Sequence, residues 1–192
     1  QVAAPTLKDF VQLAKEKPGS LSYASAGTGT LAHLAGELFK RKAGVEVTHV
    51  PYRGSAQSMI DLMQGRIELS VSTIPPTLQH IREGKLRAYA AMSEKRNVSL
   101  PEVPTVAEAG VPGCEAALWT AIVVPAGVPA DIIKKLNAAV LAAVATPEIQ
   151  QAMTIQGIDP EPGPPEAVSE RIKADIVKWK DVVMAAKITG AQ

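Results

Sequence analysis

The chain has 192 residues, 46% of them hydrophobic and 20% charged, so it can bury a sizeable core and is neither disordered nor fibrous. Its 20 lysines and arginines nearly balance its 19 aspartates and glutamates, and the net charge of +1 argues against a nucleic-acid or anionic-membrane partner held by bulk electrostatics. The single cysteine, Cys114, excludes an internal disulfide and a cysteine-based zinc site. The chain has no apolar run of about 18 residues, and its start at Gln1 without a signal sequence predicts a processed or trimmed product.

The first half of the chain alternates between extended and helical patterns. Thr6 and Asp9 predict a capping box for a first helix, which should end at 18–19. We then expect strands at 21–25, 45–50, 67–73 and 86–92, and helices at 31–42, 55–65 and 75–83. Alternating β and α segments with short connections predict an α/β fold with a mostly parallel, doubly wound sheet.

The second half has a different composition of elements. Three prolines interrupt residues 100–113, around a short helix expected at 106–109. A buried strand is expected at 116–124 and helices at 130–145, 148–156 and 165–187, with room for a short strand in the connector 157–164. Three helices around one firm strand do not make a balanced α/β unit, so this half resembles part of a larger unit.

The most informative segment for function is the sequence YASAGTGT at 23–30, which joins an expected strand to an expected helix. A helix amino terminus has free N–H groups and a partial positive charge, glycines let an anion approach the backbone, and hydroxyls add donors. This pattern predicts a carboxylate or phosphate site, although a plain helix cap with a glycine turn explains it equally well. The candidate ligand-binding residues in this loop are Ser25, Ala26, Gly27, Thr28, Gly29 and Thr30.

Two further strand-to-helix turns should lie at the same edge of a parallel sheet. In the first, Arg53 could hold a carboxylate with two hydrogen bonds and Tyr52 could cover a ligand, with Gly54 completing the turn. In the second, Ser72 and Thr73 could supply hydroxyl or backbone donors. The alternative interpretations are a solvated arginine and a plain turn before a helix.

The sequence shows no catalytic or metal-binding pattern. His33, His49 and His80 lack metal-ligand spacing; we expect His33 to pack in the first turn of its helix and the other two to lie at the surface. Cys114 has no reactive motif and is expected to be a small buried residue. Walker and dinucleotide fingerprints are absent, and so is a nucleophile elbow. We therefore expect neither an enzyme nor a bound metal or cofactor.

Four motifs together resemble one family. The runs LSYASAGTGTLAHLAGELF at 21–39, HVPYRGSA at 49–56, PTVAEAG at 104–110 and PAGVP at 125–129 are similar to the periplasmic solute-binding receptors of tripartite tricarboxylate transporters, the Bug family. The motifs occur in the family's order, and the likeness runs from the first helix to the last.

This resemblance implies a periplasmic receptor of the type II binding-protein fold, whose two lobes close like a flytrap on a small organic acid or amino acid. It implies delivery of that ligand to membrane permease subunits. The loop 25–30 matches the family's carboxylate-holding loop, and 52–54 matches its Tyr-Lys/Arg-Gly turn. Ser72 and Thr73 stand where many members have Asp-Asn, which removes a partner for a ligand amine.

The family's chain begins well upstream of this one, with a Pro-Gly-Gly type loop that faces the ligand. By resemblance we therefore expect a receptor fragment, with one complete ligand-binding lobe at 1–116 and, at 117–192, the return strand and C-terminal helices of an incomplete second lobe. The alternative is the effector-sensing domain of a transcription regulator, which shares the two-lobed plan. An enzyme acting on phosphorylated substrates is a more remote third interpretation.

Overall fold

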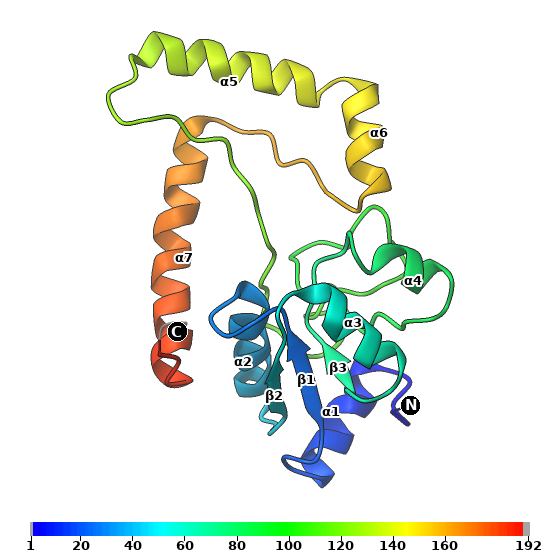
Figure 1. The fold of residues 1–192 in the computed structure, drawn as a ribbon. Coiled ribbons are helices and arrows are strands. Elements are labelled where there is room, and N and C mark those ends of the chain that lie inside the picture. Colours follow the sequence, from blue (N-terminus) through cyan, green and yellow to red (C-terminus); the bar gives the residue numbers. More distant parts are fainter. Residues whose placement is uncertain (1, 190–192) are drawn as a thin grey trace.

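The structure, a computed structural model, describes residues 2–189 and alternates helices with short strands over its first half. Figure 1 shows the elements, which are α1 (Leu7–Glu16), β1 (Ser22–Ser25), α2 (Leu31–Ala43), β2 (Thr48–Pro51), α3 (Ser55–Met63), β3 (Leu69–Ser70), α4 (Leu78–Arg82), α5 (Ala130–Val144), α6 (Pro147–Ile155) and α7 (Pro165–Ala185). Within residues 2–189, no helix has both the length and the hydropathy required to cross a bilayer.

The three strands form a parallel sheet in the order β2-β1-β3, as the alternation of elements predicts. The chain moves outward from β1 to β2 through α2 and returns past β1 to β3 through α3. Right-handed crossovers therefore place α2 and α3 on opposite faces of the sheet. All three strands end at the same edge, and the loops that follow them meet there.

The ends of α1 and α2 are set by local sequence. The side chain of Thr6 accepts a hydrogen bond from the backbone N–H of Asp9 at 3.2 Å, and the backbone N–H of Thr6 donates to the Asp9 carboxylate at 3.0 Å, which confirms the capping box. Thr30 caps α2 through a bond from the backbone N–H of His33. Gly44 ends α2 in the left-handed conformation, with φ of 64°.

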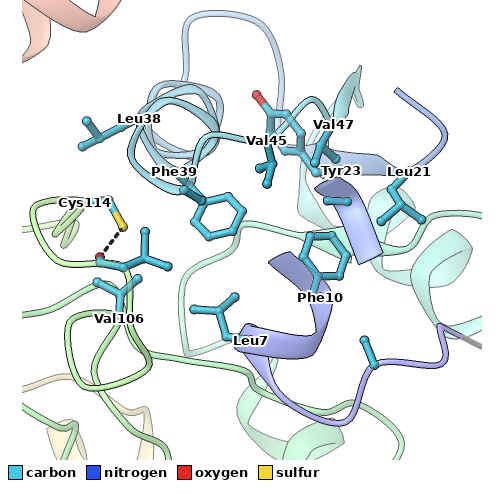
Figure 2. Close-up of a cluster of buried hydrophobic side chains, with 14 of the residues drawn as sticks. Leu7, Phe10, Leu21, Tyr23, Leu38, Phe39, Val45, Val47, Val106 and Cys114 are labelled. Carbon is cyan, nitrogen blue, oxygen red and sulfur yellow. Dashed lines mark hydrogen bonds between the residues drawn. The ribbon is translucent and has the colours of Figure 1, made fainter. Parts of the chain in front are cut away.

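The main hydrophobic core lies between α1, α2 and the sheet, and later segments of the chain close it (Figure 2). Phe10 and Tyr23 are at most 1% exposed, and Val106 and Cys114 from the second half pack in the same cluster. The thiol of Cys114 donates to the Val111 carbonyl at 3.2 Å, and burial raises the pKa of that thiol to about 11. Cys114 is the small buried residue expected from the sequence.

Gly36 allows α2 to approach β1 closely. A Cβ atom at position 36 would lie 2.2 Å from Cε2 of Tyr23, a distance that real Cβ contacts do not show. The phenol above this glycine is buried and donates hydrogen bonds to the Glu37 carboxylate at 2.8 Å and the His33 carbonyl at 3.3 Å. The ring position is therefore fixed both by packing and by its hydroxyl.

Several expected elements are shorter than predicted or absent. The strand expected at 67–73 is only Leu69–Ser70, and the helix expected at 106–109 is a turn. The segment 86–92 forms no strand, only an isolated parallel bridge between Ala91 and Thr105. The apolar side chains of 67–73 and 86–92 are buried or partly buried, as their hydrophobic runs predict, but strand geometry also requires a neighbouring backbone to pair with.

The strand expected at 116–124 was also wrong. The segment forms no strand, and its apolar side chains are open to solvent, with Leu118 63%, Ile122 76% and Val123 76% exposed. Helices α5 and α6 contain no buried residue, and the connector 157–164 holds no strand. Its apolar sequence makes the segment suited to burial, but no described strand lies beside it. The division into lobes at 1–116 and 117–192 stays a prediction.

Residues 117–189 are nevertheless tied to the rest of the chain in two regions. The Asn97 amide donates to the Gly157 carbonyl at 3.1 Å and to the Asp159 carboxylate at 3.0 Å, just beyond α6. Along α7, which lies beside α2 in Figure 1, Val182 is 3% exposed and packs in the main core. The indole of Trp119 donates to the Asp175 carboxylate at 2.7 Å, which links the segment after Cys114 to α7.

The close contact between Gly36 and Tyr23 predicts how a substitution at position 36 changes stability. We expect Gly36→Ala to lower the free energy of unfolding by about 2 kcal/mol, because an overpacking penalty of about 3 kcal/mol exceeds the helix-propensity gain of about 1 kcal/mol. Denaturant unfolding followed by circular dichroism measures this. Gly163→Ala is the matched control, since its nearest neighbour is the Ala167 Cβ atom at 3.8 Å. A Gly36→Ala protein as stable as Gly163→Ala would contradict the close-packing argument.

Candidate functional site

The loop 25–30 is a compact turn held by its own hydroxyls. Ser25 is 1% exposed, and its Oγ accepts the Gly27 N–H at 3.2 Å. The Thr30 hydroxyl donates to the Gly27 carbonyl at 2.7 Å, and the Thr30 N–H donates to the same carbonyl at 3.3 Å. Gly27 has φ of 139°, and a Cβ atom there would lie 3.4 Å from the Tyr52 carbonyl oxygen. This φ lies in the region that favours glycine, whereas the Cβ distance would be an ordinary contact, so the turn itself is what requires a glycine at this position.

The amino end of α2 carries peptide donors without protein acceptors. Among residues 2–189, the N–H groups of Thr28, Leu31 and Ala32 form no hydrogen bond, and Thr28 is exposed. The Gly29 N–H, by contrast, donates to Nδ1 of His33 at 3.1 Å. Free N–H groups at the positive end of a helix dipole attract an anion, so this end of α2 can hold a carboxylate or phosphate.

The turn 52–54 lies directly against this loop. The Tyr52 N–H donates to the Ser25 carbonyl at 3.1 Å, and the Gly54 N–H donates to the Ala26 carbonyl at 3.2 Å. The Tyr52 hydroxyl donates to the Asp61 carboxylate at 2.9 Å; burial, and then this contact, raise the pKa of Tyr52. Arg53 is exposed and forms no ion pair with any described residue, so its guanidinium can meet a ligand or solvent.

The third predicted loop is the least closely connected. Ser72 and Thr73 are exposed and follow β3 at the same edge of the sheet as the other two loops. The Thr73 carbonyl accepts the Thr77 hydroxyl at 3.2 Å. Within the described chain, no hydrogen bond joins Ser72 or Thr73 to the other two loops, so the structure brings 25–30 and 52–54 together and leaves 72–73 beside them.

A pair of histidines lies against the loop 25–30. The rings of His33 and His49 are stacked, with centroids 3.9 Å apart and planes 7° from parallel. His49 Nε2 lies 2.7 Å from the Ser25 Oγ, and the Tyr23 ring packs against the His49 ring with the two centroids 4.9 Å apart. The burial expected for His33 is confirmed at 7% exposure. His49, expected at the surface, is instead half-buried against the loop, because β2 pairs with β1 in the register that sets His49 opposite Tyr23.

Burial determines the charge of the histidine pair. Desolvation, with a contribution from the neighbouring His33, lowers the pKa of His49 to about 4. Desolvation also lowers the pKa of His33, against the opposing field of Glu37. Both rings are therefore neutral near neutral pH. Sequence inspection missed the pair because the two residues are 16 positions apart and only the sheet register aligns them.

The site has no arrangement suited to a metal. Over the described residues 2–189, no group of three or more His, Cys, Asp or Glu side chains is placed to hold an ion. The stacked histidines present their nitrogens to the Gly29 amide and the Ser25 hydroxyl instead. The donors available to a ligand are thus peptide N–H groups, hydroxyls and one guanidinium.

Comparison with known proteins gives one family. Residues 1–188 match the sequence model of the tripartite tricarboxylate transporter family receptor. A curated relative from Pseudomonas sp. strain P51, a UPF0065 protein in the tcbD-tcbE intergenic region, is 38% identical over 189 residues, which are 96% of this chain and 56% of that protein.

Solved structures agree with the sequence match. The R. palustris protein Rpa4515 with adipate has a TM-score of 0.85 at 34% identity, over 98% of this chain and 63% of that one. MatC from Rhodopseudomonas palustris with bound malate has a TM-score of 0.75 at 30% identity, over 94% of this chain and 63% of that one. The expected α/β fold of the periplasmic binding proteins is confirmed. The chain spans between half and two thirds of the length of these proteins.

The buried histidine pair predicts how stability depends on pH. In the unfolded chain His49 binds a proton below about pH 6.5, whereas in the folded chain it stays neutral down to about pH 4. The unfolded state therefore binds more protons in this window, and the free energy of unfolding should fall as the pH is lowered through it. Denaturant unfolding at a series of pH values measures the slope.

His49→Gln is the control for this slope, because carboxylates also titrate at acidic pH. The variant has no ionisable group at position 49, so its stability should fall less steeply between about pH 6.5 and about pH 4 than that of the wild type. Equal slopes for the two proteins would show that His49 is not held neutral by its surroundings.

Proposed function

The chain belongs to the tripartite tricarboxylate transporter receptor family, and from this membership we propose that it is part of an extracytoplasmic receptor that captures a small carboxylated organic acid. The observation that carries the proposal is the set of peptide donors at the amino end of α2, next to the turn 52–54. The proteins with adipate and with malate show that related folds accept dicarboxylates.

The loop 25–30 would hold one carboxylate of the ligand. The unpaired N–H groups of Thr28, Leu31 and Ala32 supply donors, and the dipole of the 13-residue helix α2 adds favourable potential. Because the loop is already tied by the Ser25 and Thr30 hydroxyls, little conformational entropy remains to be lost on binding. The Ser25 side chain acts through this internal bonding, and Thr28 is the hydroxyl exposed to a ligand.

The neighbouring loops would recognise the rest of the ligand. Arg53 is free to make a charge-assisted contact with a second acidic group, and Tyr52 stands beside it with its hydroxyl turned to Asp61. Gly54, with φ of 98°, lets the turn reach the Ala26 carbonyl. Ser72 and Thr73 offer neutral hydroxyls without a carboxylate, which favours an acid lacking an amino group.

The receptor interpretation also covers the second half of the chain. We assign 1–116 to the ligand-binding lobe and 117–192 to the other lobe of a two-lobed receptor. The exposed Leu118, Ile122 and Val123 agree with a segment that packs against further protein. Periplasmic location, transfer of the ligand to permease subunits and the absence of catalysis are part of the same proposal, and they follow from the family's role as receptors. Sensing of an effector by a regulator has no specific support from the site.

Binding of adipate tests the proposal. We expect the chain to bind adipate with a dissociation constant near millimolar, since only one side of the ligand is enclosed and its carboxylate stays partly solvated. In a titration followed by NMR, the amide signals of Thr28, Leu31 and Ala32 should shift more than those of residues far from the loop 25–30. A longer protein that includes both lobes should bind adipate far more tightly, because enclosure adds contacts and excludes water.

Two controls sharpen this titration. Adipamide has the same chain length but no charge, so it should leave those amide signals in place, and a chelator should leave adipate binding unchanged because the donors are not a metal. Equal shifts with adipate and adipamide, or shifts confined to residues far from the loop 25–30, would refute a carboxylate site here.

A further inference from the structure

The stacked histidines bond to the two ends of the loop 25–30. His49 Nε2 lies 2.7 Å from the hydroxyl oxygen of Ser25, where the loop begins. His33 Nδ1 accepts the Gly29 N–H at 3.1 Å, where the loop turns into α2. The rings are parallel at 3.9 Å, so movement of either one displaces the other. The two imidazoles thus connect the sheet, the helix and the loop.

We propose that His33 and His49 are positioning residues that hold the loop 25–30 in the shape that receives an anion, a role that rests on the proposed receptor function. The loop contains two glycines in six residues, and such a segment has high conformational entropy when untethered. Two side-chain bonds restrict it before the ligand arrives. The loop then loses its conformational entropy during folding rather than on binding, so more of the interaction free energy with the anion appears as affinity.

The bond to Gly29 requires one protonation state of His33. A protonated imidazole donates at both nitrogens and cannot accept an N–H, so Nδ1 must be bare and the proton must sit on Nε2. Burial favours the neutral ring and lowers the pKa of His33, and the stacked His49 from β2 covers one face of that ring. On α2, Lys40 also opposes a positive charge while Glu37 favours one, and Tyr23 from β1 engages Glu37 by a hydrogen bond at 2.8 Å.

The competing explanation is that the rings are only core packing. Packing depends on the volume of a side chain, whereas positioning depends on where its acceptor or donor atom lies. In asparagine the amide group takes the place of Nδ1 of histidine, and in glutamine it reaches the place of Nε2. The two positions use different nitrogens, so the two explanations predict different results for the same four variants.

The experiment is a crossed set of amide substitutions with adipate as the probe. At position 33, His33→Asn keeps an acceptor for Gly29 and should bind adipate within about twofold of the wild type, while His33→Gln should bind about five- to tenfold more weakly. At position 49 we expect the reverse order of adipate affinities. His49→Gln keeps the contact to Ser25 and should bind adipate more tightly than His49→Asn, which loses that contact. A pure packing role predicts no reversal between the two positions, and that result would overturn the proposal.

A measurement without ligand separates this proposal from the receptor function. In protein labelled with nitrogen-15, a scalar coupling across the hydrogen bond should join the Gly29 amide nitrogen to Nδ1 of His33, and the ring should be protonated at Nε2. The Gly29 amide should exchange slowly in the wild type and in His33→Asn, and faster in His33→Gln. If adipate and malate do not bind but this pattern holds, the positioning role stands and the receptor proposal fails.

If a variant does not fold, the wild-type protein alone can test whether His33 holds the loop 25–30 through its bond to Gly29. As the pH is lowered, the Gly29 coupling should disappear together with protonation of His33, and the Gly29 amide should then exchange faster. A proton on Nδ1 at neutral pH, or a Gly29 amide that does not respond when His33 titrates, would refute the proposal.

Discussion

The packing of Tyr23 against Gly36 is the contact on which the rest of the site depends. It brings α2 so close to β1 that a single methyl group at position 36 would overlap the phenol ring. The hydroxyl of the same tyrosine reaches the His33 carbonyl in the first turn of α2, and its ring contacts His49 from β2. One buried side chain therefore sets the distance between sheet and helix, and with it the position of the helix amino end that follows β1.

Parallel pairing then supplies the second condition for a site. Since β1, β2 and β3 run in the same direction, the loops after them share an edge, and the bonds from Tyr52 and Gly54 to the loop 25–30 join two of these loops into one surface. The electrostatics of this surface come from the backbone rather than from a cluster of basic residues. That agrees with a chain whose net charge is only +1 and whose candidate site holds a single arginine.

The second half of the chain makes few contacts with the first half and exposes many apolar side chains. Its attachment to the first half uses a few specific contacts, among them the hydrogen bond from the Asn97 amide to the Gly157 carbonyl and the packing of Val182 in the main core. Most apolar side chains of α5 and of the segment 116–124 remain open to solvent. The proposed two-lobed receptor accounts for this asymmetry, because 117–192 would then pack against the remainder of the second lobe.

Features that depend on neighbouring residues and on motif order can be predicted from the amino-acid sequence. The box formed by Thr6 and Asp9, the bounds of α2 between Thr30 and Gly44, the parallel β-α succession and the family could all be predicted, because capping and turn chemistry are local. Which extended segments find a partner strand depends on long-range packing, so 86–92 and 116–124 were wrongly expected to form strands. The stacking of His33 on His49 has the same origin, because sheet register and a close helix approach are long-range properties that no local pattern encodes.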